Sequence, residues 1–118
     1  MANIYDSINQ LEREVRELDE FVQLNEAMDK VLADEAATKI YHEFRDLQMS
    51  FQTKMQLGQE PSEDEVKKAQ DLQKEMQAND EINALMEREQ QLNKILNDVN
   101  DAVTRPIREI YNKANAKD

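Results

Sequence analysis

The chain has 118 residues, of which 35% are charged and 5% aromatic, and its formal net charge at pH 7 is −11. This length is typical of one domain and is too short for a core that also encloses a deep active site. The negative charge would repel a phosphate backbone and an anionic membrane surface, so we expect neither direct nucleic-acid binding nor membrane association.

Glycine, proline and cysteine are scarce or absent, with one, two and no residues respectively. Because the tight turns of all-β proteins need glycine and proline often, their scarcity favours helices. The absence of cysteine excludes disulfides, thiolate catalysis and cysteine-bound metal clusters. The chain has no basic N-terminal stretch followed by an apolar run, and no window long and apolar enough for a membrane span, so we expect a cytoplasmic protein.

Two amphipathic helices are predicted at the start of the chain, over residues 3–18 and 20–32. The first has one apolar stripe with alternating steps of four and three residues, and its charged residues face water. The stripe changes phase around Asp19, which is predicted to cap the second helix after a bend or break. The members of the first stripe are Ile4, Ile8, Leu11, Val15 and Leu18.

The third helix is predicted over residues 35–57, with Asp34 as its N-cap. Gly58 follows the last turn, where a glycine commonly ends a helix. The apolar stripe of this helix continues almost to its end and is a candidate interface or core surface. The candidate residues on it are Phe44, Leu47, Phe51 and Met55.

A short polar helix over residues 63–77 follows the only obvious loop. Ser62 and Glu65 have the spacing of a capping box at its start. Because this helix has few apolar residues, we expect it at the edge of a bundle.

The last predicted helix, over residues 81–113, has an apolar stripe about 40 Å long at ~1.5 Å per residue. A small monomer cannot cover a stripe of this length. Pro106 lies within the stripe and predicts a kink near Val103 or a new short helix. The candidate interface or core residues of this stripe are Leu85, Leu92, Leu96, Val99 and Val103.

Residues with catalytic or ligating chemistry do not form a recognisable set. The lone histidine, His42, has Lys39 three residues before it, where a helical di-metal site needs a glutamate. Three serines do not combine with it into a nucleophilic triad, and one glycine cannot make a phosphate loop. We therefore predict a protein that is not an enzyme, with no catalytic residue, cofactor or metal site.

Three surface features leave alternatives open. Methionines and phenylalanines, such as Met49 and Phe44, line either the core or an adaptable groove. A glutamine face from Gln48 to Gln59 suits either helix docking or solvation. The end of the chain, from Ala102 onward, is weakly basic and is a candidate nucleic-acid contact, although so few bases release few counterions.

Several segments together resemble the YlbF/YmcA-like family of Firmicute bacteria, and within it the YheA-type branch. The resemblance covers nearly the whole chain. Its motifs are helix caps and apolar spacings, which indicate a fold better than an activity. They comprise Asn3-Ile4-Tyr5-Asp6, Ala33-Asp34-Glu35-Ala36, Phe44-Arg45-Asp46-Leu47-Gln48, Leu57-Gly58-Gln59 and the long final helix.

The resemblance implies an all-helical protein that forms dimers or larger assemblies. Better-studied relatives act with a third protein on RNA processing by a membrane-bound endoribonuclease, and promote competence, sporulation and biofilm formation. Those relatives bind iron–sulfur clusters through cysteines, which this chain lacks.

We therefore predict a single all-α domain over residues 1–118, an antiparallel bundle of four to five helices with a long C-terminal helix. The predicted function is that of a non-enzymatic adaptor that forms a homo-oligomer and binds an unidentified protein partner. A regulator of RNA processing that docks on a ribonuclease complex is the alternative, and an unrecognised enzyme or ligand carrier is a third hypothesis.

Overall fold

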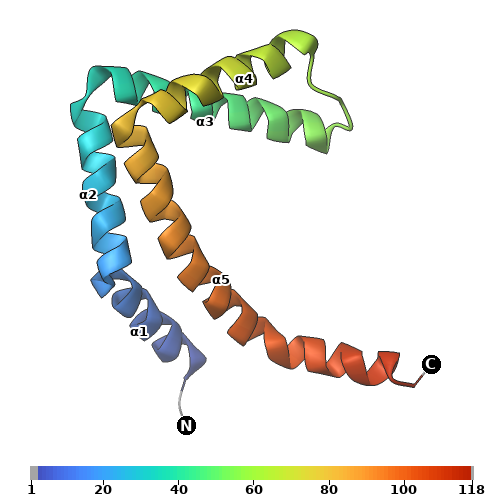
Figure 1. The fold of residues 1–118 in the computed structure, drawn as a ribbon. Helices are drawn as coiled ribbons and strands as arrows, with labels where there is room; N and C mark the ends of the chain where they lie inside the picture. Colours follow the sequence, from blue (N-terminus) through green and yellow to red (C-terminus); the bar gives the residue numbers. More distant parts are fainter. Residues whose placement is uncertain (1–2, 118) are drawn as a thin grey trace.

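The computed structural model describes residues 3–117 and contains five α-helices (Figure 1). It confirms the all-α fold with a long C-terminal helix, and no strand occurs in the described residues. The helices are α1 (Ile4–Glu17), α2 (Asp19–Ala33), α3 (Glu35–Gln56), α4 (Glu63–Ala78) and α5 (Asp80–Asn115).

The helices form two antiparallel pairs that point in different directions (Figure 1). The helix α2 packs along the first half of α5, whereas α3 and α4 form a hairpin at the upper end of the molecule. The radius of gyration is 19.4 Å, whereas a compact chain of this length has about 13 to 14 Å. The molecule is therefore open, and the second half of α5 extends away from the other helices.

A small apolar core lies where α2, α3 and α5 meet. Val31, Ile82 and Leu85 have the largest fully buried side chains, and Ala27 and Ala37 complete the cluster. No charged or polar side chain is buried within the described range. Burial of aliphatic surface therefore holds these three helices together.

The break between α1 and α2 is confirmed, but the predicted cap at Asp19 is wrong. Leu18 is the N-cap residue and has an extended conformation, with φ −64° and ψ 141°. Its apolar side chain makes no capping hydrogen bond. Asp19 is instead the first residue of α2, where a carboxylate interacts favourably with the helix dipole.

The junction between α2 and α3 is stabilised by a threonine. Asp34 occupies the predicted N-cap position of α3, but its side chain makes no capping hydrogen bond. Thr38 Oγ1 donates to the carbonyl oxygen of Val31 at 2.8 Å. The same carbonyl also accepts from the Asp34 amide at 3.1 Å. The threonine bond therefore adds a second donor at the end of α2 and links it to the first turn of α3.

The hairpin between α3 and α4 has the predicted termini. Gly58 has φ +70°, and the amides of Gly58 and Gln59 donate to the carbonyls of Met55 and Lys54 at 3.1 and 2.8 Å. This pattern is a Schellman motif, which favours glycine. Ser62 Oγ accepts from the Glu65 amide at 3.2 Å and so caps α4 as predicted.

The helix α5 continues through Pro106, so the prediction of a new short helix near Val103 is wrong. Side chains supply hydrogen bonds in the turn before the proline. Thr104 Oγ1 donates to the Asn100 carbonyl at 2.7 Å, and Arg108 Nη2 donates to the Asp101 carbonyl at 3.2 Å. Proline lacks the amide that would bond to the Ala102 carbonyl, and these two bonds lie beside that position without replacing it. The helix α5 changes direction in its last third (Figure 1).

Replacing Leu85 by alanine should lower the free energy of unfolding by roughly 2–5 kcal/mol, because the side chain is buried and its removal leaves a cavity. Chemical denaturation at one protein concentration measures this change. Leu57→Ala is the control, because Leu57 is exposed. Equal effects of the two substitutions would contradict the position of the core.

Replacing Gly58 by alanine should lower the free energy of unfolding by about 1 kcal/mol, because only its positive φ opposes a side chain. No atom lies within 4 Å of the position that its Cβ would take. Gly58→Asn should cost less, since asparagine tolerates this conformation better. If Gly58→Asn lowers the denaturation midpoint as much as Gly58→Ala, the positive φ is not the reason for the loss of stability.

Candidate protein-interaction surface

The apolar stripe of α5 becomes progressively exposed along the helix. Leu92 is 7% exposed, Leu96 38% and Val103 63%, and Ile107 and Ile110 are exposed as well. The stripe therefore begins as core and ends as surface. The helices α3 and α4 lie elsewhere, and α2 covers only its first half (Figure 1).

An apolar groove of about 380 Å³ lies between α1 and α5. Exposed Glu12 and Arg16 line one edge and form an ion pair with each other at 3.0 Å. Because this pair satisfies both charges, the groove presents mainly hydrocarbon to an incoming group. Its apolar lining consists of Ile8, Leu11, Val15, Phe21, Leu96 and Val99.

The helix α1 forms the outer wall of this groove and is weakly held. Its backbone approaches only that of α2, and among the helices of the described chain it alone has no buried residue. A helix of 14 residues is marginal in water without tertiary packing. Its apolar stripe therefore has a face that the single chain does not cover.

The whole chain exposes an unusually large surface. Its accessible area is 9746 Å², whereas a compact monomer of this mass exposes about 6,600 Å². The excess, roughly 3,000 Å², is comparable with the area that obligate dimers bury. The chain therefore exposes enough surface for a contact of that size.

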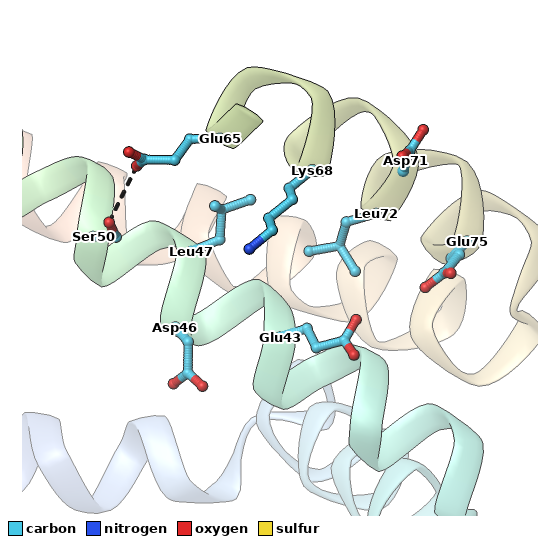
Figure 2. A pocket seen from close by; sticks show the side chains of 9 residues that line it. All are labelled: Glu43, Asp46, Leu47, Ser50, Glu65, Lys68, Asp71, Leu72 and Glu75. Atoms are coloured by element: carbon cyan, nitrogen blue, oxygen red, sulfur yellow. Dashed lines mark hydrogen bonds between the residues drawn. The ribbon is translucent and has the colours of Figure 1, made fainter. Parts of the chain in front are cut away.

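A second hollow, of about 520 Å³, lies between α3 and α4 (Figure 2). Leu47 and Leu72 form its apolar part, and Lys68 points between them. Five carboxylates line the hollow, of which Glu65 is paired with Lys54, and together with Lys68 they leave its surround acidic. An acidic surround would attract a basic segment. The five carboxylates belong to Glu43, Asp46, Glu65, Asp71 and Glu75.

Polar bonds across the hairpin converge on Glu65. Its carboxylate forms an ion pair with Lys54 and accepts hydrogen bonds from Ser50 at 3.3 Å and Ser62 at 3.1 Å. Figure 2 shows the bond to Ser50. The bonds from Lys54 and Ser50 connect α3 with α4, whereas the bond from Ser62 belongs to the cap at the start of α4. Neither serine is arranged as a nucleophile.

The candidate interface or core residues fall into separate environments. Phe44, Leu47 and Phe51 are half-buried on α3, whereas Met55 is 78% exposed. Leu85 and Leu92 are buried on α5. Since α3 packs mainly on α2 and α4, and α5 mainly on α2, the two stripes do not pack along each other.

The remaining candidates for chemistry lie apart. His42 is exposed and near the ring of Tyr41, with ring centroids 6.1 Å apart. Residues 3–117 contain no group of three side chains placed to bind a metal ion. Within the same range, every helix lacks the apolar length that crossing a bilayer requires.

A sequence profile of the family described as control of competence regulator ComK, YlbF/YmcA, matches residues 4–108. The chain belongs to this family. The UPF0342 protein of Limosilactobacillus fermentum is 42% identical over 111 residues, covering 94% of this chain and 92% of that protein. The UPF0342 protein of Oceanobacillus iheyensis is 40% identical over 114 residues, covering 97% of each.

Two solved structures of proteins from Bacillus species share the fold. A protein of unknown function (DUF964) from Bacillus stearothermophilus superposes with a TM-score of 0.80 at 29% identity, covering 92% of this chain and 95% of that one. The yheA protein from Bacillus subtilis gives 0.71 at 29% identity, covering 93% and 100%. The family resemblance seen in the sequence is therefore confirmed.

Neither the groove between α1 and α5 nor the hollow between α3 and α4 was predicted from the sequence. The α1 stripe was visible, but its spacing does not show that α1 and α5 diverge. The acidic hollow had a signal, because Glu43 and Asp46 on α3, and Asp71 and Glu75 on α4, recur at helical spacing. That signal becomes informative only when the two helices are known to form a hairpin.

Proposed function

We propose that the protein is a non-enzymatic regulatory adaptor of the cytoplasm that self-associates and binds another protein. The observation that carries the proposal is the uncovered apolar face of α1 and of the second half of α5. Contiguous apolar surface of this kind marks interaction sites in soluble proteins.

The charge distribution favours protein contact over nucleic-acid contact. The chain has a net charge of −11, and the hollow between α3 and α4 is surrounded by carboxylates. A basic, partly apolar segment of another protein has the chemistry that complements Leu47, Leu72 and these acids. The family's description as competence control is consistent with a regulator that acts through such contacts.

Replacing Val103 by aspartate should reduce the solution mass from at least two chains to one, because it places a charge in the exposed apolar face. Light scattering coupled to size exclusion, over a dilution series, measures the mass. Met49→Asp is the matched control, since Met49 is 61% exposed and lies on α3. Wild-type protein that has the mass of one chain throughout would refute self-association.

Raising the salt concentration should shift the midpoint of dissociation to lower protein concentration. Two copies with −11 each repel one another, and salt screens this repulsion while leaving apolar burial intact. Dilution series at low and high salt compare the midpoints. A midpoint that moves to higher protein concentration with salt would indicate that ion pairs, and not apolar contacts, hold the copies together.

A further inference from the structure

The exposed stripe of α5 has a spacing that is symmetric about Val103. Its successive steps are three, four, four and three residues, so each member on one side of Val103 has a counterpart at equal distance on the other. Two such helices placed antiparallel, with the two Val103 residues opposite, bring apolar residues against apolar residues along the whole stripe. The stripe consists of Leu96, Val99, Val103, Ile107 and Ile110.

The face that carries this stripe is free of charge. At 3.6 residues per turn, the charged residues from Lys94 to Arg108 lie on the opposite side of α5. Asp101 and Arg108 contact each other there, with 3.5 Å between Oδ1 and Nη1. The flanks of the stripe carry uncharged side chains such as Asn100 and Tyr111. A second helix could approach this face without burying an ion.

From this symmetry we infer that a second copy of the chain fills the groove between α1 and α5, with its own α5 antiparallel and centred on Val103. This inference rests on the proposed self-association and specifies its geometry. A two-fold axis passes near the paired Val103 residues. The α1 helix of each copy then packs against the α5 helix of the other, which completes a four-helix arrangement.

The dimensions and charges fit this occupant. The exposed segment from Leu96 to Ile110 is about 21 Å long at ~1.5 Å per residue, and the 14 residues of α1 give the same length. Residues 94–113 carry four bases and three acids in a strongly acidic chain, whereas residues 4–17 carry four acids and two bases. The pairing therefore places a segment with a net charge of +1 near the acidic α1 of the partner, which lowers the repulsion between two acidic chains although the charges from Lys94 to Arg108 lie on the far side of α5.

The exposed surface of the chain is also large enough for such a dimer interface. A specific interface buries about 800 Å² of each partner, and an obligate one buries more. The roughly 3,000 Å² by which this chain exceeds a compact monomer can supply either. The groove, the exposed stripe and the unburied helix α1 are adjacent, so one contact would cover all three.

Single cysteines test the pairing directly, because the natural chain has none. Under mild oxidation Val103→Cys should form a covalent dimer as its main product, since opposed residues come within the Cα distance of about 4.4–6.8 Å that a disulfide needs. Leu96→Cys and Ile110→Cys should each fail to link to themselves, but should link to each other when mixed. A length tag on one variant identifies the mixed product on a non-reducing gel.

Asp101→Cys, on the charged side of α5, is the control and should give little covalent dimer. The solution mass of every reduced variant is compared with that of the wild type. This comparison separates a variant that no longer folds or assembles from one whose cysteines lie too far apart to link. Leu96→Cys linking to itself would show a parallel pair and overturn the inferred geometry while self-association stands. Efficient linking of Asp101→Cys would overturn the inferred face, and a wild-type mass of one chain would overturn both proposals.

Discussion

The apolar face of α5 is longer than the other helices of the same chain can cover. At ~1.5 Å per residue the 36 residues of α5 span about 54 Å, whereas the 15 residues of α2, its main partner, span about 22 Å. The core can therefore form only along the first half of α5, where Ile82 and Leu85 are buried. The open shape, the groove beside α1 and the large accessible surface all follow from this difference in length.

Local chemistry made the helices predictable, because caps and apolar periodicity act within a few residues. Gly58 and Ser62 end and begin helices as their neighbours in sequence indicate. Periodicity does not show which part of a stripe its own chain covers. Leu85 and Val103 belong to one stripe on one helix, yet the first is core and the second is surface. That distinction depends on where α2 ends and on the directions of the helix pairs, which no local pattern encodes.

Membership of the YlbF/YmcA family gives this surface a regulatory context. The chain has no cysteine, so the likeness to the family concerns the fold and includes no cysteine chemistry. The chain has instead an apolar face on α1 and α5 and an acidic hollow between α3 and α4. Because these lie on different helix pairs, the proposed contact with a second copy and the proposed contact with another protein involve different residues.

The direction of α1 depends on one residue. Leu18 alone separates two helices of 14 and 15 residues, and its ψ of 141° lies far from the helical value near −42°. A rotation at this single bond would merge α1 and α2 into one straight rod and remove the outer wall of the groove. The width of the groove is thus set by a backbone torsion at Leu18, a residue that does not line the groove. Sequence changes beside Leu18 could therefore tune access to the groove without altering any side chain that lines it.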